Sequence, residues 1–335
     1  MNAHKMTHKQ RVREVLAGQA PDRLPVSVWG HDFLREWSAQ ELAAHTIERQ
    51  RQFDYDFVKL NPRWTLFAEP WGNQYIPPTE QRFPKLEHKI VHTLADIPRI
   101  PIVPRDHVVL AEHVAAMGLV VDELGDSVDV LATLFSPLAV LGLLCGGVGQ
   151  PLISFAQEEP DIVHQALDHI TTTLTEHSED LLSAGASGLF FAALQWTSLE
   201  VCDADFYDTF GRPYDLRVLA AAESAPFNIL HVCGNHTDLP RFFDYPTQVF
   251  NWDNFGPGNL TLAEAAALTA GTNKVVAGGI PHRKLHKIDA AELAQIAQQA
   301  IAGVDGRLLL AGGCGVGAML DDSIRSAVTN VPDQI

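Results

Sequence analysis

The sequence predicts an α/β protein with one (β/α)8 barrel domain over residues 1–335. Short apolar segments of β-type composition alternate with longer amphipathic segments, which is the pattern of repeated strand–helix units around a parallel sheet. The chain has eight such apolar segments, the number that a closed barrel of this type requires. No Ser/Gly linker, low-complexity tract or charge block divides the chain, so a single domain is expected.

The eight expected strands share a run of β-branched, aromatic or leucine residues bounded by turn-forming residues. In chain order they cover residues 25–30, 56–61, 129–137, 188–195, 227–234, 248–254, 274–280 and 307–316. The segments between them are expected to be helical. In residues 290–304, for example, apolar residues recur at spacings of three and four, and Gly303 marks the helix end. Residues 62–106 are instead rich in proline and aromatic residues, and predict an insertion with a small hairpin over one mouth of the barrel.

Charge and cysteine content limit the partners, the location and the thiol chemistry to be expected of this protein. Lys and Arg number 24 against 41 Asp and Glu, and a formal net charge of -17 disfavours nucleic-acid backbones and anionic membranes as partners. The sequence shows neither a signal peptide nor a run of about 18 apolar residues, so we expect a cytoplasmic protein with no membrane segment. The four cysteines, Cys145, Cys202, Cys233 and Cys314, are scattered. They are expected to be reduced thiols, available as ligands or catalysts.

Potential zinc ligands follow several of the expected strands. The chemistry of a (β/α)8 barrel lies at the carboxyl ends of its strands. His231 and Cys233 end one strand, where alternate residues share a face, and Cys314 ends the last strand. Catalytic zinc takes three protein ligands and keeps one position open, so these three residues predict a zinc site. Asp253 ends the next strand and is a candidate fourth ligand or catalytic residue. The alternative for each cysteine is a buried core residue.

Other residues at the same mouth are candidates for catalysis and substrate binding. His31 ends the first strand and is a candidate general base, its alternative being a hydrogen-bonded structural residue. The candidate substrate-binding residues are the aromatic residues Trp29, Phe191 and Trp196, the amides Asn61 and Asn251, and Arg63. The aromatic residues would form an apolar wall, or else pack in the core. Arg63 would bind an anionic group, or else form an ion pair.

Four segments together resemble the uroporphyrinogen decarboxylase superfamily over nearly the whole chain: "RVREVLAGQAPDRLPVSVW" (11–29), "GASGLFFA" (185–192), "HVCGN" (231–235) and "LLLAGGCGV" (308–316). The resemblance implies a single barrel and two possible branches: the decarboxylases of haem synthesis, and zinc methyltransferases that move methyl groups between corrinoid proteins and thiols. The zinc branch carries a His-x-Cys pair and a distant cysteine. These positions match His231, Cys233 and Cys314.

The decarboxylase branch fits this sequence poorly. Where that branch has arginines for substrate carboxylates, this chain has Gly30, His31 and Asp32, and where the branch has its essential aspartate it has "NPR" at 61–63. The resemblance therefore implies a methyltransferase that uses Zn²⁺ to activate a small thiol. Because no Asp-x-His-x-x-Gly corrinoid-binding signature is present, the methylcobamide is expected on a separate corrinoid protein.

Two alternatives remain open at this point. One is a lyase, such as a carboxy-lyase, or a hydrolase in which zinc-bound water reacts and His31 or Asp253 acts as general base. The other is a non-catalytic barrel that binds or handles corrinoid. The sequence does not distinguish coenzyme M, homocysteine or a folate-type compound as the small partner, nor does it give the oligomeric state.

Overall fold

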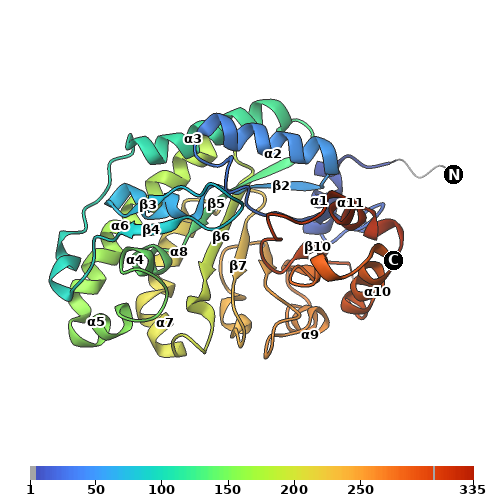
Figure 1. Cartoon of the computed structure of the whole chain (residues 1–335). Coiled ribbons are helices and arrows are strands. Elements are labelled where there is room, and N and C mark those ends of the chain that lie inside the picture. The colour runs from blue at the N-terminus through green and yellow to red at the C-terminus, as the bar shows by residue number, and fades with distance from the viewer. Residues whose placement is uncertain (1–4, 305) are drawn as a thin grey trace.

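The computed structural model describes residues 5–304 and 306–335, and it contains the expected (β/α)8 barrel (Figure 1). Each of the eight segments predicted as strands holds one strand of a parallel sheet, in the order β1-β10-β9-β8-β7-β6-β5-β2. The strands are β1 (Val26–Ser27), β2 (Phe57–Leu60), β5 (Asp129–Phe135), β6 (Gly188–Leu194), β7 (Ile229–Val232), β8 (Val249–Asn251), β9 (Val275–Ile280) and β10 (Leu308–Gly312). The fold class is thus confirmed.

The first strand is shorter than the predicted span 25–30, and the barrel closes beside it through one backbone hydrogen bond and two that involve side chains. The backbone N–H of Asp56 donates to the carbonyl of Val26 at 2.9 Å, and the Asp56 carboxylate accepts from the Val26 N–H at 2.8 Å. Ser27 Oγ donates to the carbonyl of Phe57 at 2.7 Å. Because a carboxylate takes the backbone donor that a neighbouring strand would use, β1 and β2 are joined without a regular ladder.

The core has two layers, one inside the barrel and one between strands and helices. All seven residues of β5 are buried, because one face of the strand points into the barrel and the other lies under the helices. Inside the barrel the rings of Phe57 and Phe227 meet edge to face, with centroids 5.4 Å apart. The polar residues at the strand ends therefore lie next to a closely packed barrel interior.

Helices surround the strands (Figure 1). They are α1 (His8–Leu16), α2 (Ala39–Phe53), α3 (Val108–Leu124), α4 (Pro137–Leu144), α5 (Leu152–Glu158), α6 (Pro160–Ser183), α7 (Ala204–Phe210), α8 (Arg212–Ala220), α9 (Leu262–Leu268), α10 (Ala290–Ile301) and α11 (Asp322–Asn330). The expected helix after residue 290 is α10. The Asp289 side chain caps its first turn, and it ends before Gly303, whose φ is 82°. None of the described helices is both long and apolar enough to span a bilayer.

Residues 62–106 form the predicted insertion with a hairpin. Short 3-10 helices (Trp64–Phe67, Glu69–Trp71 and Leu94–Arg99) flank the antiparallel strands β3 (Gln74–Ile76) and β4 (Lys85–His88). Phe83, in the connection between β3 and β4, borders the cavity at the mouth of the barrel. The insertion thus forms part of the wall of the site.

Candidate metal centre

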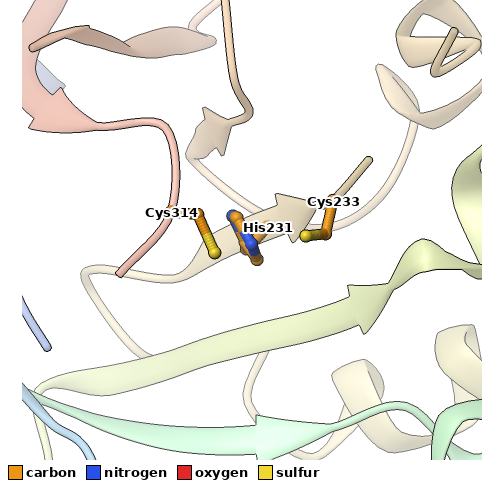
Figure 2. Close-up of side chains that lie close together, drawn as sticks. All are labelled: His231, Cys233 and Cys314. Atoms are coloured by element: carbon orange, nitrogen blue, oxygen red, sulfur yellow. The ribbon is translucent and has the colours of Figure 1, made fainter. Parts of the chain in front are cut away.

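His231, Cys233 and Cys314 come together at the carboxyl ends of β7 and β10 (Figure 2). His231 lies within β7, Cys233 directly follows that strand, and Cys314 lies in the loop after β10. One ligand atom from each residue lies within 4.8 Å of the other two. One imidazole and two thiols form a donor set that suits zinc, and they fit a site that leaves a fourth position open.

The glycines around Cys314 allow its loop to approach the neighbouring strand end. A Cβ atom on Gly313 would lie 2.5 Å from Cα of Asp253 and 2.8 Å from the carbonyl oxygen of Trp252. Because both neighbours are backbone atoms, any larger residue would push the loop away. Gly313 therefore places Cys314 near His231.

The backbone before Cys233 is also constrained. Leu194, the last residue of β6, adopts φ 53° and ψ -154°, and its carbonyl accepts a hydrogen bond from the Cys233 N–H at 3.3 Å. A non-glycine residue in this region costs about 1–3 kcal/mol, and such strain is concentrated at functional sites. The strained end of β6 thus helps to fix the start of the Cys233 loop.

A hydrogen bond fixes the tautomer of His231. The Nδ1 atom of His231 lies 2.7 Å from Oδ1 of Asn251, and the Asn251 amide nitrogen donates to the carbonyls of Ala277 and Gly312, each at 3.0 Å. Because the amide nitrogen is committed to two acceptors, Oδ1 must accept, so Nδ1 of His231 carries the proton. The Nε2 lone pair is then available to a metal.

The two neighbouring thiols shift each other's pKa in opposite directions. The hydrogen bond from Cys233 lowers the pKa of Cys314 well below its usual range. The same hydrogen bond, together with burial, raises the pKa of Cys233. The lowered pKa favours the thiolate form of Cys314, which is the form that binds metal.

The three residues border a cavity of about 440 Å³ at the barrel mouth. Its wall is largely apolar and includes six aromatic residues, Trp29, Phe33, Trp64, Phe83, Phe135 and Phe190. The ring of Phe190 meets that of Trp29 at 4.9 Å and that of His231 at 5.3 Å. A cavity of this size and lining is typical of a small-molecule site.

His31 borders the same cavity and is held by a buried acid. Its Nδ1 atom lies 2.8 Å from Oε2 of Glu36, a residue that is 1% exposed, and its ring stacks on Phe33 at 5.0 Å. Burial raises the pKa of Glu36, while the bond from His31 opposes that shift. When Nδ1 donates to the carboxylate, Nε2 is left to accept a proton. The sequence singled out His31 but gave no sign of its partner.

Lys59 is a functional candidate that the sequence analysis missed. It lies in β2 and borders the cavity, with its ammonium 4.6 Å from the ring centre of Phe190 and 5.8 Å from that of Trp29. Burial lowers its pKa to about 7, although Cys314 and Glu36 act in the opposite direction. The sequence did contain an indication of this residue. In the strand segment "FVKL", Lys59 shares the inward face with Phe57, and lysine is rarely buried in a barrel interior.

Some predicted substrate-binding residues line the cavity and others do not. Trp29 and Asn61 border it. Phe191 does not, because neighbouring residues of a strand point to opposite faces and Phe190 takes the inward position. Trp196 is buried against Phe206, with stacked rings 6.0 Å apart.

Arg63 also lies outside the cavity lining. It is 4% exposed, and its guanidinium binds Glu69 at 2.8 Å and also pairs with Glu112. Two carboxylates therefore already satisfy this charge, and the structure supports the ion-pair alternative over binding of a substrate anion.

Asp253 and Asn251 are close to the centre without belonging to the ligand cluster. The Asp253 carboxylate pairs with Nε of Arg283 at 2.9 Å and is not among the ligand atoms that cluster within 4.8 Å. It also does not border the cavity, and its predicted roles as fourth ligand or catalytic residue stay predictions. Asn251 is fully buried and contacts His231 rather than a substrate.

Several solved structures share the fold of this chain. The chain resembles a methyltransferase from Methanosarcina mazei over 98% of both chains, with 18% identity and a TM-score of 0.82. It also resembles a B12-independent methionine synthase from Shewanella sp. W3-18-1 over 92% of this chain and 96% of that one (12% identity, TM-score 0.60). A putative vitamin-B12-independent methionine synthase from Listeria monocytogenes gives 13% identity, coverage of 93% and 95%, and a TM-score of 0.56. At these identities the likeness concerns the fold.

No curated protein matches the sequence. The family model "Uroporphyrinogen decarboxylase (URO-D)" matches residues 7–321, nearly the whole chain. The chain therefore belongs to the uroporphyrinogen decarboxylase family.

Proposed function

We propose that this protein is a zinc-dependent methyltransferase that moves a methyl group between a corrinoid protein and a small thiol. The observation that carries the proposal is the cluster of His231, Cys233 and Cys314, whose ligand atoms lie within 4.8 Å of one another beside a cavity of about 440 Å³. Bound zinc would lower the pKa of a thiol and so supply a nucleophile for methyl transfer at neutral pH.

The surrounding residues would prepare the site for that chemistry. Cys233 and Cys314 would contribute two negative charges that balance the metal charge, and Asn251 would hold His231 with Nε2 free. His31, oriented by Glu36, would accept the thiol proton at Nε2. The aromatic wall would exclude water from the reacting sulfur.

The corrinoid would come from a separate protein that docks at the mouth of the barrel. Phe83 and Met319, which lie at or next to the cavity rim, are 68% and 82% exposed. Exposed apolar side chains around a cavity favour contact with another protein or with an apolar face of a cofactor. A methyltransferase stands among the similar structures and supports this reaction class. The B12-independent methionine synthases among them make a non-corrinoid donor the competing possibility.

The first test measures zinc per chain in protein purified without chelators. We expect about one zinc in the wild type, none in Cys314→Ser, and an unchanged content in Cys202→Ser. Cys202 is a suitable control because it is buried away from the cluster and donates to the Trp196 carbonyl, a bond that serine can keep. Equal zinc in wild type and Cys314→Ser would refute the ligand assignment.

The second test separates the possible donors. Zinc-loaded protein is incubated with methylcobalamin and, separately, with a methylated folate, each with 2-mercaptoethanesulfonate or homocysteine as acceptor. Methylation of a thiol by methylcobalamin alone, absent in Cys314→Ser, is the expected result. Transfer from the folate alone would replace the corrinoid part of the proposal and leave the zinc part intact.

A further inference from the structure

Among the described residues that line the cavity there is no aspartate or glutamate, and Lys59 is the only lysine or arginine. Within the described chain, the hydrogen bond recorded for its ammonium goes to Asn61, and no carboxylate oxygen lies within 4.0 Å. An ammonium has three donors, so Lys59 retains hydrogen-bonding capacity toward the cavity.

None of the described charged groups nearby is available to pair with the Lys59 ammonium. Two thiolates and one divalent ion sum to zero, so the metal centre needs no further cation. Glu36 is engaged by His31 at 2.8 Å. The rings of Phe190 and Trp29 stabilise an ammonium through their π faces, but they do not neutralise its charge. A buried charge is costly unless it is paired, and here the open side is the cavity.

We propose that Lys59 determines substrate specificity: the cavity takes an organic anion with an aromatic or otherwise apolar body, and the anionic group pairs with the Lys59 ammonium. The six aromatic residues that line the cavity would contact the body, and its volume exceeds what a two-carbon thiol fills. The same charge works against quaternary ammonium compounds, which an aromatic wall alone would favour.

This inference rests on the proposed function in one respect: the small substrate binds in the cavity. The anion would lie against β2, where Lys59 and Asn61 border the cavity, while the metal ligands border it from β7 and the loop after β10. One substrate could then bind with its anionic group at Lys59 and its reacting atom toward the metal ligands.

The test uses three probes of similar body and different charge: benzenesulfonate, methyl phenyl sulfone and benzyltrimethylammonium. A sulfonate is a weak metal ligand, so its preference over the sulfone reports the lysine and not the zinc. Calorimetry on the zinc-loaded full chain should show the sulfonate binding about tenfold or more tightly than the sulfone. Benzyltrimethylammonium should bind more weakly than the sulfone.

Lys59→Met removes the charge at similar length and should bring the sulfonate and the sulfone to equal affinity. Lys85→Met is the matched control, since Lys85 lies in β4 and does not border the cavity, and it should keep the preference. A wild-type protein that binds the sulfonate no better than the sulfone, or not at all, overturns the inference even if Lys59→Met does not fold. A sulfonate preference that persists in Lys59→Met overturns it as well. Loss of zinc or of methyl transfer with the preference intact would refute the proposed function alone.

Discussion

Nδ1 of His231 lies 2.7 Å from Oδ1 of Asn251, and this contact determines which ring nitrogen faces the candidate metal site. The arrangement depends on four strands. Asn251 ends β8, His231 lies in β7, and the Asn251 amide is anchored to the carbonyls of Ala277 in β9 and Gly312 in β10. The barrel framework thus sets the orientation of a ligand, which is how supporting residues tune metal affinity.

Replacing Asn251 tests this link. We expect Asn251→Leu to weaken zinc binding roughly 10- to 100-fold, because His231 loses the acceptor that fixes its tautomer. The measurement is zinc transfer to a chromophoric chelator. Asn273→Ala, a change at an exposed position, is the control and should leave affinity unchanged. Wild-type affinity in Asn251→Leu would show that His231 is oriented by other contacts or is not a ligand.

Two adjacent phenylalanines give a second prediction. Phe190 borders the cavity and Phe191 does not, although both are buried. Phe190→Leu should weaken benzenesulfonate binding, whereas Phe191→Leu should leave binding unchanged, and each should lower the free energy of unfolding by about 1 kcal/mol. Calorimetry and urea unfolding measure the two effects. A binding loss confined to Phe191→Leu would reverse the assignment of the strand faces.

This pair shows why the sequence predicted the strand but not its inward residue. The run "GLFFAAL" is apolar on both faces, because a barrel strand is buried inside and outside, so alternation carries no information there. The assignment needs the register of β6 against its neighbours, which pairs Phe190 with Ile229 and Phe191 with Leu230. Sequence reasoning chose Phe191 without access to that register.

The cluster of His231, Cys233 and Cys314 was easier to predict because its signal is chemical. A His-x-Cys pair at one strand end and a cysteine among glycines at another are unusual positions for core residues, and the structure brings all three together. For Arg63 the sequence left two alternatives open, because its ion-pair partners Glu69 and Glu112 lie in an insertion and a helix whose packing is not evident from spacing.

Glu36 supplies a third prediction, which concerns rate and not metal content. If its carboxylate orients His31 as a proton acceptor, Glu36→Gln should lower the rate of thiol methylation roughly tenfold or more. His31→Ala should have the larger effect, and the double variant should match His31→Ala because the two residues act as one unit. Zinc per chain should stay at the wild-type value throughout. Additive losses would mean that the two residues act separately.

Asp215, far from the cavity in α8, predicts a dependence of stability on pH. Its Oδ2 atom accepts from the hydroxyls of Tyr207 at 2.6 Å and Tyr245 at 3.1 Å, yet burial raises its pKa to about 7. An unfolded aspartate has a pKa near 3.9, so between about pH 4 and 7 the folded state binds a proton that the unfolded state has lost. The stability contributed by protonated Asp215 is therefore complete below about pH 4 and is lost as pH rises through about 7.

Asp215→Asn removes this titration, so the free energy of unfolding should fall less steeply from pH 4 to 7 in the variant than in the wild type. The full shift corresponds to at most about 4 kcal/mol over that range. Urea unfolding at several pH values measures the slope, with Asp205→Asn, at an exposed position in α7, as the control that keeps the wild-type slope. Parallel curves for wild type and Asp215→Asn would mean that Asp215 stays ionised in the folded protein, with the two tyrosine hydroxyls offsetting the cost of its burial.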